Sequence, residues 1–467
     1  MKSGSGKESA VAETNHSLGK RKHRAKLSPT QLIAMMFALI ILAGALLLML
    51  PVASRSGRSC GFLPALFTAT SATCVTGLVL FDTWTQWSLF GQIVILCMIE
   101  LGGLGFMSVA SLVVFLLRKK VGLRQRMVMA QALSLNEMDG VVKLQKWVLV
   151  GSLSIQLAGA LILFFRFLPE YGVATAAWWG IFHSVSAFCN AGFDIFGSVA
   201  PGASLITFQS DFVVCITLIL LISVGGLGFF VWEEVIRVRS FKKLSVYTRL
   251  VLISSAVLTV GGAALILLLE WNNPCTLGPM SVPVKLLNGL FQSVTLRTAG
   301  FVSVDQALLT DAGKGVSMLL MIIGGSSGST AGGVKTVTMV VLLLFIWARC
   351  RGKNSVTVFR KTIPEDKVTD AATIVFIVMA LAVFGAIFVS ATSAVSFTDS
   401  LYETVSALAT VGLTAGATGK LSLAARILII IYMYFGRVGV LTLSLGFLMG
   451  NKAQERFRYA YTNLLIG

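Results

Sequence analysis

Four glycines, each preceded by small hydroxylated residues, mark the positions of this sequence that could do chemistry. They are Gly77, Gly192, Gly300 and Gly412, in the segments ALFTATSATCVTGL, HSVSAFCNAGF, QSVTLRTAGF and ETVSALATVGLT. Glycine tolerates backbone conformations that aim carbonyl oxygens inward, and carbonyls gathered at that density can replace the hydration shell of a cation. These residues therefore predict cation coordination by backbone oxygens.

The elements that must position these glycines are short apolar segments of about a dozen residues, too short to cross a hydrocarbon layer of about 30 Å. They are 63–73, 176–188, 283–295 and 397–409. We expect a re-entrant hairpin at each, because non-helical backbone at membrane depth is tolerated only inside protein or along a water-filled cavity. Each short helix would aim its negative C-terminal end at the axis, which favours a cation.

Longer segments, apolar and almost free of charge, flank these hairpins and predict membrane spans. They are 32–50, 90–117, 147–165, 212–232, 250–269, 316–346, 371–389 and 427–449. A composition of 56% hydrophobic and 12% charged residues also indicates a chain that a bilayer solvates. Eight spans place both termini on one side, and 28 of the 38 Lys and Arg residues then fall on that side. The positive-inside rule identifies it as the cytoplasm, so the charge of +18 does not predict nucleic-acid binding.

The glycines lie 115, 108 and 112 residues apart, a near-constant period that predicts four tandem repeats. A second element recurs in step: GGLGF at 102–106 and 225–229, GGSSGSTAGG at 324–333, and FGRVG at 435–439. The predicted fold is an all-α integral membrane protein of four helix–re-entrant pore helix–helix (M1-P-M2) repeats, with eight transmembrane helices around a pseudo-fourfold pore. The predicted divisions are a disordered basic cytosolic tail (1–28), pore repeats at 29–118, 119–240, 241–350 and 351–450, and a cytosolic C-terminal tail (451–467).

On these motifs the sequence resembles the potassium-transport superfamily of bacterial Trk and Ktr membrane subunits and plant HKT transporters, and most closely the Ktr membrane subunit, KtrB. The likeness covers nearly the whole chain from Pro29 onward. It implies potassium as the ion, since sodium-preferring members can carry serine at the first glycine position. It also implies a selectivity filter whose backbone carbonyls bind potassium. Its residues are Val75, Thr76, Gly77, Asn190, Ala191, Gly192, Thr298, Ala299, Gly300, Thr410, Val411 and Gly412.

The glycine-rich stretch in the sixth span predicts a break, because its residues have poor helix propensity. The resemblance implies an intramembrane gating loop there: Gly324, Gly325, Ser326, Ser327, Gly328, Ser329, Thr330, Ala331, Gly332 and Gly333, with Lys335 and Arg437 as gating residues. A phosphate-binding loop is excluded, since Val334 separates Gly333 from Lys335 and the flanks are spans. A charge inside a span must face protein or water, so Arg437 is either a structural ion-pair partner or a positive barrier below the filter.

Other charged residues also allow hypotheses. Arg297, beside the third filter segment, is predicted to point away from the pore toward a carboxylate such as Glu403 on the neighbouring pore helix. Glu100 and Lys335 are candidates for internal pairing. His183 is interpreted as a hydrogen-bonding packing residue. Carboxylates follow the first three filter segments and either concentrate cations at the outer vestibule or are ordinary loop charges; they are Asp82, Asp194 and Asp305.

The function predicted is potassium uptake across the cytoplasmic membrane by the ion-translocating subunit of a Ktr-type system. The alternative is a sodium/potassium-coupled or sodium-permeable secondary transporter of the same superfamily. An enzyme is not expected, because the spans contain neither a paired nucleophile and base nor a metal-ligand cluster. The resemblance implies a homodimer on a cytosolic nucleotide-binding ring of KtrA-type subunits. No cofactor is expected in this chain; sodium is a possible activator, and nucleotide is expected only on the partner.

Overall fold

The computed structural model describes residues 29–105 and 141–439, and helices dominate this part of the chain. The α-helices are α1 (Pro29–Leu48), α2 (Phe62–Thr73), α3 (Thr83–Gln86), α4 (Leu89–Gly103), α7 (Val141–Phe188), α8 (Phe212–Leu227), α9 (Phe229–Val238), α10 (Val246–Glu270), α11 (Val282–Thr295), α12 (Asp311–Ile322), α13 (Thr336–Cys350), α14 (Glu365–Thr392), α15 (Phe397–Leu408) and α16 (Leu423–Val438). The 3-10 turns are η1 (Pro51–Ala53), η2 (Phe196–Ser198), η3 (Ser204–Phe208), η4 (Phe241–Lys243), η5 (Gln306–Leu308) and η6 (Thr418–Lys420). The predicted tails 1–28 and 451–467 lie outside the described residues.

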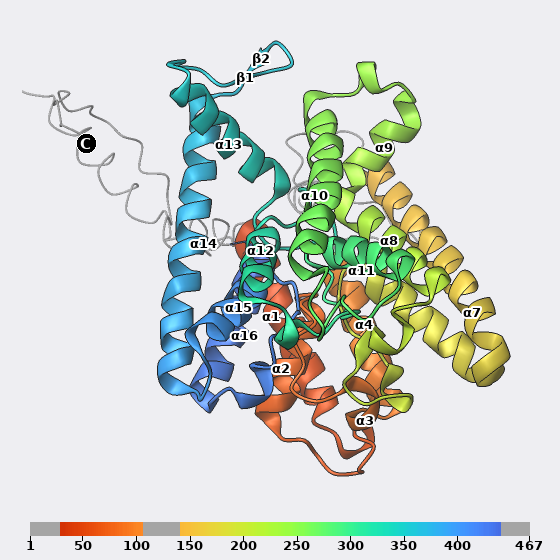
Figure 1. Ribbon diagram of the computed structural model, residues 1–467. Coiled ribbons are helices and arrows are strands. Elements are labelled where there is room, and N and C mark those ends of the chain that lie inside the picture. The colour runs from red at the N-terminus through yellow and green to blue at the C-terminus, as the bar shows by residue number, and fades with distance from the viewer. Residues whose placement is uncertain (1–28, 106–140, 440–467) are drawn as a thin grey trace, which may run out of the picture.

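One small sheet departs from the predicted all-α fold. Strands β1 (Thr357–Val358) and β2 (Lys361–Thr362) pair antiparallel within a basic connection between α13 and α14. This hairpin and the α9–α10 connection lie at one end of the molecule, and α3 lies at the opposite end (Figure 1). The chain therefore has two distinct ends, with the helices running between them.

Each long helix packs against a shorter one that precedes a glycine turn. The contacting pairs include α1 with α2, α10 with α11, and α14 with α15. The remaining short helix, which precedes Gly192, forms the last part of α7. Helix α7 is interrupted at Gly172 (φ 76°, ψ 167°), three residues after Pro169. A left-handed glycine after a proline is a backbone break, so the predicted separation of span and hairpin in 147–188 agrees with this geometry.

The exterior of the long helices is apolar. Leu268 on α10 is 78% exposed and Phe376 on α14 is 74% exposed, and many other large apolar side chains share this outward position. Among the described residues, four helices are long and apolar enough to cross a membrane, namely α1, α7, α10 and α14, and the α8–α9 pair brings the number to five. Helices α4 and α13 are apolar but shorter. The surface therefore fits a lipid environment, while the count of eight spans stays a prediction.

The helix after each turn stops at an equivalent glycine wherever the second element has the form GxxG. Gly105 (φ 82°), Gly228 (φ 93°) and Gly439 (φ 94°) all have left-handed backbone. At Gly228 the chain bends by 94° into α9. The span predicted over 212–232 is therefore bent at the fourth position of the motif, and its crossing of the membrane stays a prediction.

Candidate functional site

The four glycine turns, residues 74–78, 189–193, 297–301 and 409–413, share one unusual backbone pattern. In each, the residue two before the glycine has positive φ, and the glycine itself has positive φ; the residues are Val75 (57°) and Gly77 (95°), Asn190 (60°) and Gly192 (69°), Thr298 (67°) and Gly300 (81°), and Thr410 (52°) and Gly412 (91°). Positive φ is uncommon for a residue with a side chain and rarest for a β-branched one. Alternating the sign of φ along an extended segment turns successive carbonyls to the same side. The recurrence in all four turns therefore indicates a constraint on where the carbonyls point.

The four turns close into a ring. A Cβ added to Gly77 would lie 2.6 Å from the carbonyl oxygen of Ala191 in the second turn. The same addition at the other glycines meets the middle carbonyl of the next turn around the ring: Gly192 meets Ala299 O at 2.7 Å, Gly300 meets Val411 O at 2.6 Å, and Gly412 meets Thr76 O. Each turn thus contacts its successor, and the fourth contacts the first. Glycine is required at these positions because any side chain would displace a neighbouring carbonyl.

A hydroxyl on each preceding helix ties its end to the turn. Ser71 Oγ accepts from Gly77 N–H (3.0 Å) and Ser406 Oγ accepts from Gly412 N–H (3.1 Å). In the other two turns the hydroxyl donates to the carbonyl after the glycine: Ser186 to Phe193 O and Thr295 to Phe301 O, both at 2.7 Å. Hydroxylated residues are evident here in the sequence, but this tethering role was not predicted. Their signal was a Ser six residues before glycine, or a Thr five before in the third turn.

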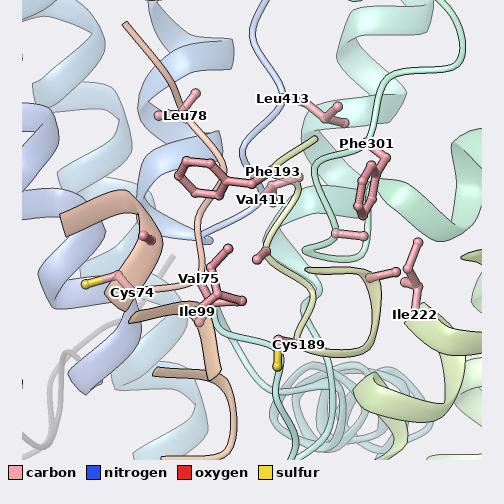
Figure 2. Close-up of a cluster of buried hydrophobic side chains, with 14 of the residues drawn as sticks. Cys74, Val75, Leu78, Ile99, Cys189, Phe193, Ile222, Phe301, Val411 and Leu413 are labelled. Carbon is pink, nitrogen blue, oxygen red and sulfur yellow. The ribbon is translucent and has the colours of Figure 1, made fainter. Parts of the chain in front are cut away.

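The turn residues are buried, and some of their polar atoms lack protein partners. Five such atoms have no hydrogen-bond partner in the described part of the chain: Thr76 Oγ1, Asn190 Nδ2, Arg297 Nε, Thr298 Oγ1 and Thr410 Oγ1. Buried polar atoms are nearly always satisfied by protein, water or an ion. The residue after each glycine is large, apolar and at most 1% exposed; these residues are Leu78, Phe193, Phe301 and Leu413 (Figure 2). Packing therefore holds the turns from behind, while unpaired polar atoms remain among them.

The glycines of the second element let the following helix approach each turn. A Cβ at Gly102 would meet Thr73 O, at Gly225 it would meet Phe188 O, and at Gly436 it would meet Leu408 O. Each of these carbonyls lies four residues before the turn glycine of the same unit. Close packing thus explains these three glycines.

Between α12 and α13 the predicted gating loop, residues 324–333, is an irregular segment held by backbone hydrogen bonds. Ser326 N–H donates to Gly226 O (3.0 Å) and Thr330 N–H to Gly225 O (3.2 Å), while Gly328 O accepts from Phe229 N–H (2.9 Å). The loop is therefore fixed to the break between α8 and α9. The predicted helix break in the sixth span agrees with this geometry.

Thr330 joins the loop to the turns and to Arg437. Its hydroxyl donates to Phe188 O (3.1 Å) and contacts Asn190 Oδ1 (3.4 Å) in the second turn. Its carbonyl accepts from Arg437 Nη1, while Arg437 Nη2 donates to the carbonyls of Gly102 and Gly103 at the end of α4. The ion pairs among the described residues do not include Arg437. Carbonyl dipoles thus surround this charge, and the ion-pair interpretation of Arg437 is not supported in the described region.

The loop lies against the fourth turn as well. A Cβ at Gly333 would lie 3.0 Å from Ala409 O, and one at Gly332 would meet the side chain of Thr410. Lys335 Nζ donates to Ala331 O (2.8 Å), which ties the end of the loop to its own middle. The structure therefore brings the predicted loop, Lys335 and Arg437 together directly beside the turns.

Arg297 does not make the predicted pair with Glu403. Its guanidinium donates to Ser255 Oγ (3.2 Å) and Thr259 Oγ1 (3.2 Å) on α10. Glu403 instead accepts from Thr414 Oγ1 (2.7 Å). The prediction that Arg297 points away from the ring holds, but the partner was wrong, because the hydroxyls of its own packing helix are nearer.

The remaining polar predictions have mixed outcomes. His183 is a packing residue as predicted: Nδ1 donates to Trp179 O (2.7 Å), Nε2 accepts from Ile195 N–H (3.2 Å), and the ring stacks on Phe196. Glu100 accepts from Gln156 Nε2 (3.0 Å) and Cys189 Sγ (3.3 Å) rather than pairing with a cation. Within the described residues no group of three or more His, Cys, Asp or Glu could hold a metal ion.

The carboxylates after the turns organise loops. Asp82 accepts from the N–H groups of Thr85 (2.8 Å) and Gly202 (3.1 Å), and so links the segments that follow the first and second turns. Asp194 and Asp305 each accept from the backbone N–H two residues further on. Desolvation, with a smaller repulsion from Asp82, raises the pKa of Asp194 to about 6. The vestibule role stays a prediction.

The chain is similar over nearly its whole length to one family of transport proteins. Residues 9–456 match the family described as TrkH, cation transport protein. The chain belongs to the TrkH family. The potassium/sodium uptake protein NtpJ of Enterococcus hirae is 41% identical over 453 residues, covering 96% of this chain and 99% of NtpJ. The Ktr system potassium uptake protein B of Bacillus subtilis is 38% identical over 434 residues, covering 93% and 96%.

The fold agrees with this assignment. The crystal structure of the potassium transporter TrkH from Vibrio parahaemolyticus superposes with a TM-score of 0.70 at 17% identity, covering 91% of this chain and 86% of that one. Members of the TrkH family are ion transporters and not enzymes, so the chain is a multi-pass cation transport protein of the cell membrane. The resemblance found in the sequence is confirmed.

Proposed function

We propose that this TrkH-family chain is the ion-translocating subunit of a Ktr-type potassium uptake system, with the four glycine turns as its selectivity filter. The observation that carries the proposal is the closed ring, in which every turn glycine abuts the middle carbonyl of the next turn. Such a ring offers backbone oxygens from four directions to one cation, and carbonyl rings of this kind replace the hydration shell of potassium. The buried unpaired hydroxyls of Thr76, Thr298 and Thr410 fit a site that holds ions and water.

The proposed transport is passive. An inside-negative membrane potential contributes about 2.3 kcal/mol per 100 mV to the entry of each monovalent cation. The filter residues are those predicted from the sequence, and the substrate is potassium bound at their carbonyls. The relative from B. subtilis, a Ktr system potassium uptake protein, supports this ion.

Loop 324–333 and Arg437 form the proposed gate. The loop contacts the second turn through Thr330 and the fourth turn through Gly333, so it lies across the same ring. Arg437 fixes the loop through Thr330 O and contributes a positive charge that a potassium ion would have to pass. Opening then requires the loop to leave Arg437.

A sodium-permeable or sodium-coupled transporter is the second candidate. It is favoured by the 41% identity to a protein named for potassium and sodium uptake. Its filter would be the same ring of glycine turns, with weaker discrimination between potassium and sodium. Uptake of the two ions, each measured against increasing amounts of the other, distinguishes the candidates: potassium uptake that resists excess sodium supports the first, and equal uptake supports the second.

The proposed assembly is a homodimer on a cytosolic ring of nucleotide-binding, KtrA-type subunits, with both termini in the cytoplasm. The Ktr system names of the relatives support a partner component. Exposed basic residues gather around the β1–β2 hairpin, including Arg349, Arg351, Arg360 and Lys361. A positive end of the molecule is expected on the cytosolic side.

Growth on low potassium tests the proposed function. A strain deficient in potassium uptake would express the wild-type chain or Gly77→Ser together with the regulatory partner. Wild type should restore growth, and Gly77→Ser should lose potassium preference because its side chain meets Ala191 O. Failure of the wild type to restore growth, with the protein present in the membrane, would refute potassium uptake.

A further inference from the structure

Behind the filter, three of the four short helices carry a polar side chain that holds the chain segment leaving the turn. These residues lie three positions before the hydroxyl tether: His183 before Ser186, Gln292 before Thr295, and Glu403 before Ser406. Residues three apart share one face of a helix, so each side chain points to the same side as its tether. The tether holds the glycine, and the second residue reaches the segment beyond it.

The contacts beyond the glycines are specific. Glu403 accepts from the hydroxyl of Thr414, two residues after Gly412, and from that of Thr418. Thr414 Oγ1 also accepts from the Ala417 N–H (3.2 Å), so the carboxylate fixes a whole turn of the exit segment.

The other two contacts have the same topology with different chemistry. Gln292 exchanges amide hydrogen bonds with Gln306, six residues after Gly300, and Gln306 also accepts from Tyr402 OH (2.8 Å). His183 accepts from Ile195 N–H, three residues after Gly192. All three holding residues are at most 1% exposed.

The first unit breaks the pattern. Its equivalent residue is Thr68, three before Ser71, and within the described residues the Thr68 side chain makes no hydrogen bond. The first exit segment therefore lacks this attachment, although Ser71 still tethers Gly77. The ring is symmetric in its glycines but asymmetric in its support.

We propose that Glu403, Gln292 and His183 are positioning residues that set the discrimination between potassium and sodium by holding three exit segments. This inference rests on the proposed function. A ring rejects the smaller sodium ion only if its carbonyls resist moving inward, so releasing an exit segment admits sodium more readily.

Thr414→Val tests the proposal at the fourth turn. It removes one donor to Glu403 but leaves Thr418, so the carboxylate stays hydrogen bonded. The control is Thr404→Val: Thr404 is adjacent to Glu403, buried, and bonded to Ala382 O rather than to the exit segment. The readout is the sodium concentration that halves potassium uptake, corrected for the amount of protein in the membrane.

The expected result is an about two- to tenfold lower half-inhibiting sodium concentration in Thr414→Val, as loss of one buried hydrogen bond implies. Thr404→Val should match wild type. Glu403→Gln should retain most discrimination, because its amide can accept from one hydroxyl and donate to the other.

Gln292→Met tests the same proposal independently at the third turn, through the half-inhibiting sodium concentration. It serves as the test if Thr414→Val does not accumulate in the membrane. Wild-type sodium inhibition in either accumulating variant overturns the proposal, and so does an equal change in Thr404→Val. Absence of potassium uptake by the wild type would instead overturn the proposed function and this inference with it.

Discussion

Replacing Gly192 by alanine probes the closed ring most directly. The added Cβ would lie 2.7 Å from Ala299 O, 2.8 Å from Gly300 Cα and 3.0 Å from Gly300 C, all backbone atoms of the third turn. Ordinary contacts of a Cβ begin at 3.4 Å, so Ala299 O must move by about 0.7 Å. The oxygen that moves belongs to the proposed filter, and the perturbation is therefore local to the coordinating atoms.

The magnitude follows from two additive costs. Alanine with the φ of 69° seen at Gly192 has left-handed backbone, which costs roughly 1–2 kcal/mol. Crowding a close-packed site costs roughly a further 1–3 kcal/mol. The part of this cost that displaces Ala299 O opposes ion binding, and about 1.4 kcal/mol of it corresponds to a tenfold rise in the potassium concentration for half-maximal uptake.

The matched control is Gly261→Ala. Gly261 lies exposed within α10, its backbone is helical, and an added Cβ meets no atom within 4 Å. Replacing glycine inside a helix by alanine is neutral or slightly stabilising. Both variants would be compared with wild type by the concentration dependence of potassium uptake, normalised to membrane protein. Wild-type half-saturation in Gly192→Ala, or an equal loss in Gly261→Ala, would refute the ring geometry.

Three further predictions concern the proposed gate, a tether and the loop that carries Asp194. Arg437→Gln should raise potassium uptake several-fold by freeing Thr330 O; an unchanged or lower rate at normal protein amount would contradict the barrier. Ser406→Ala should lower stability by about 1–3 kcal/mol, measured by thermal unfolding in detergent, because it leaves the buried Gly412 N–H without its acceptor; an unchanged Tm argues against the tether. The raised pKa of Asp194 makes the folded protein retain a proton between about pH 4 and pH 6, so stability should fall as pH rises through this window. Asp194→Asn should remove that slope, and an unaltered slope would assign it to other groups.

The placement of the turns could be predicted from the sequence because their signals are local. An apolar segment too short to cross a bilayer, followed by a glycine at a constant period, indicates a hairpin whatever packs around it. The left-handed glycines and the break in loop 324–333 agree with that reading. Family and general fold followed from the same motifs.

The partners of buried charges could not be predicted in this way. Arg297 binds hydroxyls of α10, and Glu403 binds hydroxyls of its own exit segment, although opposite charge made them an attractive pair. The choice depends on the direction in which each side chain leaves its turn or helix, and the sequence pattern does not give that direction. Charge complementarity alone therefore chose the wrong partner.

Arg437 shows how the positions of a repeated motif can have different roles in different units. In the alignment of the second element, Arg437 occupies the position held by Gly103 in the first unit and Gly226 in the second. Glycine there leaves the backbone accessible, and those backbones indeed accept hydrogen bonds: Gly103 O from Arg437 and Gly226 O from Ser326 N–H. The arginine side chain of the fourth unit can thus bind carbonyls that the glycines of the first unit leave exposed. The asymmetry on which the proposed gate rests arises from a single replacement within the repeated pattern.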